Sequence, residues 1–185
     1  MKIFVFLSEA MMAIPDSTIV KNGNPVYLPD FDPNITARPY MALRIDRLGK
    51  SVSPRFAYRY FEQVAPCLLL TAETELQRLR EQGLPWTEAF VFDKSCVLGD
   101  FIPLQRWREE TITLELHDSN SWKLSLPEER IMYDCIAKAS ERNTLKIGDL
   151  ILIPLNSDLQ PSPLLPDSLW TINFNSSPLL KLPLR

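Results

Sequence analysis

The chain has 185 residues, with 20 lysines and arginines, 23 aspartates and glutamates and one histidine, which gives a formal net charge of -3. With 45% hydrophobic and 23% charged residues it has the composition of an ordinary globular protein, and we expect one domain over residues 1–185. The pI near 5.3 gives no electrostatic reason to expect nucleic acid or an anionic membrane as a partner.

The N-terminal segment predicts a first strand at Lys2–Leu7 rather than a signal peptide. The apolar run after Lys2 is five residues long and Glu9 follows it closely, which is short for the hydrophobic region of a secretory signal. No stretch approaches the roughly 20 apolar residues that a membrane-spanning helix requires. We therefore expect a cytoplasmic protein with no membrane partner.

Short strands follow along the chain, separated by proline-rich turns. Asn22-Gly23-Asn24 is a strong turn signal, and the apolar residues at positions 41, 43 and 45 alternate with polar ones, as in a half-buried strand. The strands expected after the first are Pro25–Leu28, Met41–Arg47, Thr111–Leu116, Asp149–Ile153 and Leu169–Phe174.

Two segments predict helices. The first is Thr71–Gln82, with Thr71 as its N-cap and with Gly83 and Pro85 ending it. The second runs from about Pro127 to Ser140, preceded by Ser125 and Glu128 at the spacing of a capping box. Because strands dominate and the helices are few and separate, the sequence predicts an α+β or mainly β fold with an antiparallel or mixed sheet.

The cysteines and the histidine argue against the common metal sites. The three cysteines are odd in number and widely spaced, with no Cys-x-x-Cys pair, which argues against a disulfide framework and against a zinc site. All three lie in apolar surroundings, so we expect them to be buried and reduced. A multi-histidine metal site is excluded, because His117 is the single histidine. The cysteines are Cys67, Cys96 and Cys135.

From Asn24 onward, several blocks of sequence resemble the fumarylacetoacetate hydrolase family, and most of all its bacterial single-domain members. The resemblance covers nearly the whole chain in one order and is weakest in the first 20 residues and between Glu109 and Glu129. The blocks are NPVYLPDF, LRIDRLGKSVSPRFAYRYFEQV, LTAETELQRLREQGLPW, FDKSCVLGDFIP and TLKIGDLILIP.

The resemblance implies a mixed β-roll with a few short helices, usually assembled as a homodimer. It also implies cleavage of acylpyruvates and related diketo acids, decarboxylation of oxaloacetate-like acids, or isomerisation of related compounds. In that chemistry a divalent cation, usually Mg²⁺, is held by three carboxylates, while a lysine polarises the substrate and a histidine and a glutamate on an N-terminal lid activate water.

The positions that the resemblance assigns to the metal carry no carboxylate here. The family's aspartate, in a pattern like Asp-Phe-Thr-Ala-Arg, falls on Leu69, and the arginine of that pattern falls on Glu73. The two glutamates of a Glu-x-Glu pair fall on Arg38 and Tyr40. Leucine offers no ligand, a phenol is a poor one at neutral pH, and arginine brings a like charge, whereas Mg²⁺ needs hard oxygen ligands.

The catalytic positions are changed as well. The lysine of the pattern Lys-Gly-Phe-Asp falls on Phe90, and the lid histidine falls on Ala13. The sequence therefore predicts no metal, no catalytic residues and no cofactor, with a former site formed by Arg38, Tyr40, Leu69 and Phe90.

Two interpretations from different classes stay open. The first is a non-catalytic protein of this fold, acting as an assembly protein or as a binder of a small keto acid or dicarboxylate through the guanidinium of Arg38. The second is an active hydrolase or decarboxylase that holds its metal with other residues, for which the candidates are Asp30, Asp32, Glu62 and Glu73.

We also expect a homodimer. The resemblance implies it, and the C-terminal segment Pro178–Leu184 has more leucine than a free tail should have.

Overall fold

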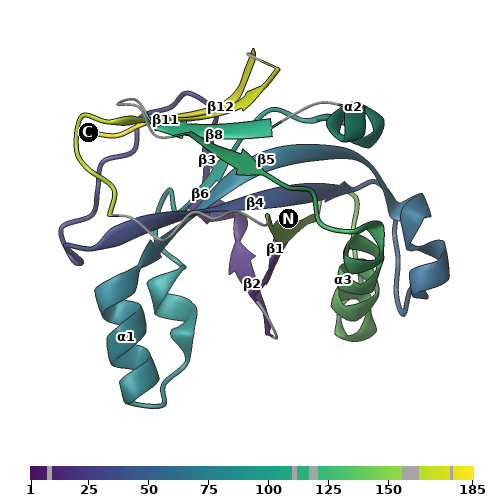
Figure 1. Cartoon of the computed structure of the whole chain (residues 1–185). Coiled ribbons are helices and arrows are strands. Elements are labelled where there is room, and N and C mark those ends of the chain that lie inside the picture. The colour runs from purple at the N-terminus through teal and green to yellow at the C-terminus, as the bar shows by residue number, and fades with distance from the viewer. Residues whose placement is uncertain (8–9, 110–111, 117–120, 156–162, 176) are drawn as a thin grey trace.

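The structure is a computed structural model that describes all residues except 8–9, 110–111, 117–120, 156–162 and 176 (Figure 1). Two sheets lie one above the other, and the helices sit at the ends of the larger sheet. The larger sheet has eight strands within the described residues, in the order β2-β1-β10-β4-β5-β6-β3, with β7 paired to β5. The smaller sheet has four, in the order β12-β11-β8-β9.

The strands of the larger sheet are β1 (Lys2–Phe6), β2 (Met11–Pro15), β3 (Ile19–Lys21), β4 (Ile35–Ile45), β5 (Phe61–Ala72), β6 (Cys96–Leu98), β7 (Ile102–Pro103) and β10 (Leu150–Pro154). Those of the smaller sheet are β8 (Ile112–Leu116), β9 (Ser121–Leu124), β11 (Leu169–Phe174) and β12 (Ser177–Pro183). The α-helices are α1 (Glu73–Glu81), α2 (Leu104–Glu109) and α3 (Glu129–Arg142), and the 3₁₀ helices are η1 (Asp16–Thr18), η2 (Pro54–Tyr60) and η3 (Trp86–Ala89). Strand β1 runs parallel to β10, and β3 to β6, while the other pairs are antiparallel. The mixed, β-rich fold with few helices that the sequence predicts is therefore confirmed.

The antiparallel pair β4–β5 is the longest ladder of the molecule, with strands of 11 and 12 residues. Side chains alternate between the two faces of a strand, so this pair divides the interior in two. On one face, Met41, Leu43 and Leu68 join a large apolar cluster that also contains Trp170 of the smaller sheet. On the other face lies a second, smaller cluster, described below.

The C-terminal leucines are used inside the chain. Strand β12 pairs with β11, and Leu180, Leu182 and Leu184 are all buried. The surplus of leucine in Pro178–Leu184 is thus explained by this packing, and it gives no separate support for a homodimer.

Several local predictions were wrong in instructive ways. Thr71 is not the N-cap of α1, because β5 continues through Ala72 and the helix begins at Glu73. The cap comes from a distant loop, where the Asp32 carboxylate accepts hydrogen bonds from the backbone N–H groups of Asn34 (2.8 Å) and Glu75 (2.9 Å). Such a carboxylate satisfies donors at the positive end of the helix as well as a local cap would.

The other predicted helices and strands differ less from the observed ones. Helix α3 has Glu128 as its N-cap and no side-chain cap, so the capping box expected from Ser125 is not formed. Pro25–Leu28 is not a strand; Val26 makes a single bridge to Leu184. The strand predicted at Met41–Arg47 begins earlier, at Ile35, and ends at Ile45. Thr111 lies outside the described residues. In the described part of the chain, no helix is long and apolar enough to cross a membrane.

Candidate functional site

The register of β4 and β5 brings the positions singled out in the sequence onto one face of the large sheet. Arg38 is the cross-strand partner of Leu69, Tyr40 is the partner of Cys67, and Thr36 is the partner of Thr71. Partners across an antiparallel ladder have Cβ atoms only about 5 Å apart. Positions 38, 40 and 69 are therefore close together, although 29 or more residues separate Leu69 from the others in the chain.

The charged group of this site is an ion pair that the sequence did not predict. Nη2 of Arg38 lies 2.8 Å from Oε1 of Glu73, and the hydroxyl of Thr36 donates to the same oxygen at 2.7 Å. The side chains are 41% and 20% exposed, so the pair is only partly shielded from water. Glu73 is the first residue of α1, where the helix dipole also favours a carboxylate.

One atom of this pair and one atom of a neighbouring residue are buried without a hydrogen-bond partner among the described residues. They are Nε of Arg38 and Oγ1 of Thr71. Leaving such a group unsatisfied costs about 1–3 kcal/mol, so polar atoms of this kind are uncommon in a plain core.

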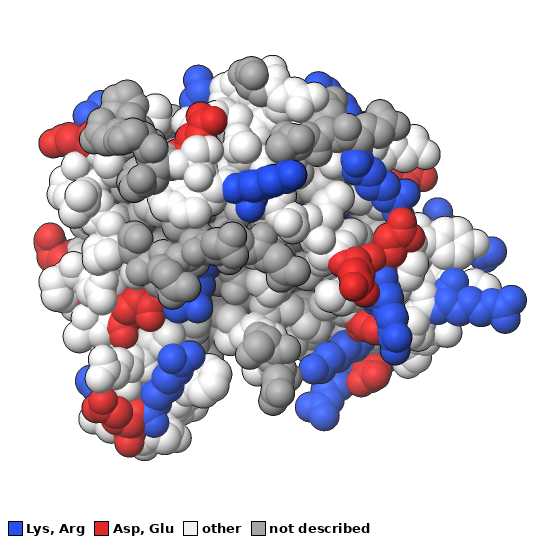
Figure 2. Space-filling model, viewed as in Figure 1, with Lys and Arg blue, Asp and Glu red and all other residues white. Residues whose placement is uncertain are grey.

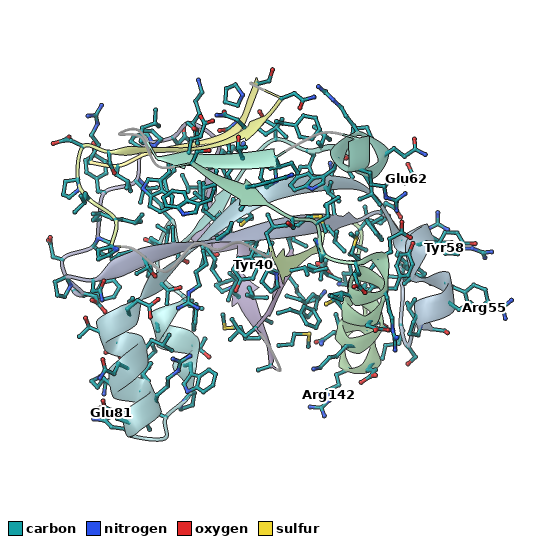
Figure 3. All side chains as sticks on the ribbon, in the orientation of Figure 1. Tyr40, Arg55, Tyr58, Glu62, Glu81 and Arg142 are labelled. Carbon is teal, nitrogen blue, oxygen red and sulfur yellow. The ribbon has the colours of Figure 1, made fainter. Side chains whose placement is uncertain are left out.

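The rest of the site is apolar. Leu69 is fully buried, and Tyr40 and Phe90 are each 3% exposed. All three belong to the smaller cluster, together with Leu76 and Leu79 of α1. Figure 3 shows Tyr40 at the middle of the large sheet, well away from the far end of α1, where Glu81 lies.

Tyr40 is held in its neutral form. Burial raises the pKa of its phenol to about 12, and Cys67 adds to that rise, while the positive charge of Arg38 lowers the pKa and offsets only part of it. A phenol with this pKa is protonated at physiological pH, so it supplies no anionic oxygen to a cation.

Two thiols lie beside the site, because Cys67 is the cross-strand partner of Tyr40 and Cys96 is that of Leu69. The sulfur atoms of Cys67 and Cys96 are 3.6 Å apart, and both residues are fully buried. The hydrogen bond to Cys96 and burial raise the pKa of the Cys67 thiol well above its usual range. Burial likewise raises the pKa of Cys135 to about 12. All three cysteines are free and buried, as predicted, and these raised pKa values disfavour a nucleophilic thiolate or a metal ligand at Cys67 and Cys135.

The residues considered as replacement metal ligands do not assemble. Asp30 is exposed, and Asp32 is occupied with capping α1. Glu62 and Glu73 stand at opposite ends of β5, a separation of about 35 Å at ~3.3 Å per residue. Among the described residues, no group of three histidine, cysteine, aspartate or glutamate side chains could hold a metal ion. The residues present therefore do not fit a divalent cation.

A pocket of about 560 Å³ adjoins the ion pair. Thr36 and Glu73 form one wall, and Gln77, Arg80 and Glu81 of α1 form another. A small ligand in this pocket would contact the Glu73 end of the pair first.

Sequence comparison decides the family. A sequence model of the family, described as fumarylacetoacetate (FAA) hydrolase C-terminal, matches residues 6–153, which is more than half of the chain. The chain belongs to the fumarylacetoacetate hydrolase family.

Curated relatives and solved structures agree with this assignment. The chain is 27% identical over 151 residues to the rat mitochondrial oxaloacetate tautomerase FAHD1, covering 79% of this chain and 68% of the relative. The human protein of the same name is 26% identical over 157 residues, with the same coverage. The fold of this fumarylacetoacetate hydrolase family member matches that of fumarylpyruvate hydrolase from Pseudomonas aeruginosa, solved with Mn²⁺ and pyruvate (TM-score 0.82, 15% identity, covering 100% of this chain and 89% of the other). It also matches 5-carboxymethyl-2-hydroxymuconate delta-isomerase from Mycobacterium smegmatis (TM-score 0.79, 18% identity, covering 99% and 78%).

Against the family pattern, the ion pair is a reciprocal exchange of charge. The resemblance places a glutamate at position 38 and an arginine at position 73, and this chain has Arg38 and Glu73 instead. The sequence alone shows that both residues differ from the family pattern. That they form an ion pair follows only from the register of β4 and β5. The Asp32 cap was missed for the same reason, since its partner is 43 residues away.

Proposed function

We propose that this chain is a non-catalytic member of the fumarylacetoacetate hydrolase family that carries out no metal-dependent cleavage, decarboxylation or tautomerisation. One observation carries the proposal. The three positions that the resemblance assigns to metal ligands hold a guanidinium paired with Glu73, a neutral phenol and a leucine side chain.

Physical chemistry supports the proposal in two ways. Mg²⁺ requires oxygen ligands in near-octahedral geometry, and the positive charge of Arg38 repels any cation placed beside it. Phe90, at the position of the expected lysine, is buried in the apolar cluster and brings no charge to a substrate.

The ligand class that fits best is a small keto acid or dicarboxylate held at Arg38. Its guanidinium has one donor engaged by Glu73, and the Arg38 side chain is 41% exposed, although Nε itself is buried and has no partner among the described residues. A planar guanidinium can bind a carboxylate through two parallel hydrogen bonds without any metal. The names of the relatives suggest the compounds to try, because they include an oxaloacetate tautomerase and a hydrolase solved with pyruvate.

Metal content and turnover test the loss of catalysis. Purified protein should contain no stoichiometric divalent cation, and oxaloacetate tautomerisation and acylpyruvate cleavage should stay at background in added Mg²⁺ or Mn²⁺. Turnover near the ~10 s⁻¹ of a typical enzyme would overturn the proposal and favour an active hydrolase with other ligands.

Calorimetric titration with oxalate, pyruvate and oxaloacetate tests the ligand. Glu73 competes for the guanidinium, so Glu73→Gln should tighten binding and Arg38→Gln should weaken it about tenfold or more. If the wild type binds none of the three acids, or if both variants bind as the wild type does, Arg38 has no ligand-binding role and the protein is better viewed as an assembly protein.

The assembly and compartment are part of the same proposal. The family resemblance supports a homodimer, which light scattering at micromolar concentration would test. The three free, buried thiols are consistent with a reducing cytoplasm.

A further inference from the structure

A second hollow lies at the opposite end of β5 from the ion pair. It has a volume of about 510 Å³, opens to the surface, and is lined by residues of η2, the start of β5, β7, α2 and α3. Figure 3 shows Tyr58 and Glu62, which line it, on the side of the molecule near α2, well away from Tyr40. We call it the β5 groove.

Three aromatic rings line the β5 groove. They belong to Tyr58 on η2, Phe61 at the start of β5 and Tyr133 on α3. Burial and the hydrogen bond to Glu129 raise the pKa of Tyr133, so its ring is a neutral phenol. The faces of neutral aromatic rings carry partial negative charge and attract cations. The ring of Tyr58 already lies 5.4 Å from the guanidinium of Arg59.

The charges of the β5 groove leave one carboxylate without compensation. Arg108 pairs with Glu129 at 2.5 Å, and the Tyr133 hydroxyl donates to the other oxygen of Glu129 at 2.9 Å. The charge of Arg108 is thereby offset in part by Glu129. Glu62 has no hydrogen-bond or ion-pair partner within the described part of the chain. Figure 2 shows acidic and basic side chains next to one another on this side of the molecule.

We propose that the β5 groove binds a small organic cation, with its ammonium group beside Glu62 and its apolar substituents against the three rings. Aromatic faces attract ammonium groups through cation–π contacts, and a carboxylate attracts them by its charge. This inference does not depend on the proposed function, because the β5 groove shares no residue with the pocket at Glu73.

Other ligand classes fit the β5 groove less well. An anion would be repelled by the carboxylate of Glu62. A neutral apolar ligand would take the Glu62 carboxylate out of water without giving it a partner, which is unfavourable.

A pair of isosteric probes tests the proposal directly. Choline carries a quaternary ammonium group, and 3,3-dimethylbutan-1-ol has the same shape with carbon in place of nitrogen and no charge. We expect saturable binding of choline by calorimetry or ligand-observed NMR, and no binding of the alcohol over the same range.

Variants of the full chain locate the site. Glu62→Gln and Tyr133→Leu should each weaken choline binding about two- to fivefold or more, while Tyr133→Phe, which keeps the ring, should change it less. Glu88→Gln removes an exposed carboxylate on η3, which packs against α1 on the opposite side of the molecule from α2 and α3; it is the matched control and should have no effect. Circular dichroism shows whether each variant is folded. If Tyr133→Leu does not fold, the proposal is tested with Glu62→Gln alone. Failure of choline to bind, equal binding of the alcohol, or unchanged binding by Glu62→Gln would each overturn the proposal.

Discussion

The two faces of the β4–β5 ladder are built by alternate residues of the same strands, yet they differ in kind. The face toward the smaller sheet is purely apolar, with side chains such as Leu43, Val64 and Leu68. The opposite face combines buried apolar side chains with the Arg38–Glu73 pair and with a Thr71 hydroxyl that has no partner among the described residues. Buried polar atoms without a partner among the described residues occur on both sides, since Nε1 of Trp107 in the larger cluster is one of them, so the charged pair is what distinguishes the second face. The second face is thus the one that carries charged and polar groups at the positions where the resemblance would place other residues.

The largest effect should come from placing a carboxylate on each face in turn. Leu68 and Leu69 are neighbours, both fully buried, and they point to opposite faces. Leu68→Asp buries a charge without a partner and should lower the free energy of unfolding by about 4 kcal/mol or more, or prevent folding. Leu69→Asp should be less harmful, because Arg38 is its cross-strand partner. Urea denaturation measures both.

Asparagine at the same two positions is the matched control. At position 69 aspartate should be better tolerated than asparagine, whereas at position 68 it should be worse. If aspartate and asparagine variants rank in the same order of stability at both positions, Arg38 does not compensate a charge on its face. The two faces then differ less than their composition suggests.

The next effect concerns a buried carboxylate that is fully satisfied, in contrast to the polar atoms near Arg38. Asp149 is 1% exposed, pairs with the Lys2 ammonium at 2.7 Å, and accepts hydrogen bonds from the backbone N–H groups of Lys2 and Lys146. It thus ties the start of β1 to the turn before β10. Asp149→Asn should cost about 1.5–3 kcal/mol of stability.

The pH dependence of stability checks the role of Asp149. Burial alone would raise its pKa, but the hydrogen bonds from Lys2 and Lys146 bring the pKa below its ordinary value. A carboxyl group whose pKa is lower in the folded state stabilises the fold above its unfolded pKa of about 3.9, and this contribution is lost as the pH falls through the folded pKa. The wild type should therefore lose stability below about pH 5 more steeply than Asp149→Asn. Parallel curves would show that Asp149 is not the group responsible.

Much of this arrangement could be predicted from the sequence, and the failures have one cause. The alternation at positions 41, 43 and 45 identified a strand, and Leu169–Phe174 was placed with its exact bounds, because periodicity and turn residues are local signals. The Arg38–Glu73 pair, the Asp32 cap and the Cys67–Cys96 contact join residues that are distant in the chain, so they depend on register, which no local pattern specifies. The same limit explains Pro178–Leu184, whose leucine content suggests a homodimer when only the sequence is considered, but whose leucines pack beside β11 of the same chain.

Reversing the ion pair should have a smaller effect than either buried carboxylate. Arg38→Glu places two carboxylates together, and Glu73→Arg places two guanidinium groups together, so each should cost about 1 kcal/mol. The double variant restores an attractive pair in the order that the family pattern has. It should recover more than half of the summed loss but not all of it, because an arginine at the first residue of α1 opposes the helix dipole. A double-mutant cycle in urea measures the coupling, and additive losses would mean that the pair contributes nothing to stability.

The smallest effect is the titration of a single phenol. It tests whether burial or the charge of Arg38 has the larger effect on the pKa of Tyr40. Burial raises the Tyr40 pKa and Arg38 lowers it, with a net value of about 12. The absorbance of phenolate near 295 nm, measured for the wild type minus Tyr40→Phe across alkaline pH, isolates this one residue. We expect the difference to titrate near pH 12, well above the ordinary value of about 10 for tyrosine. In Arg38→Gln the midpoint should move still higher, because the charge that favours phenolate is gone. A wild-type midpoint at or below 10 would mean that the charge of Arg38 outweighs burial at Tyr40, and that this face is more polar than its packing indicates.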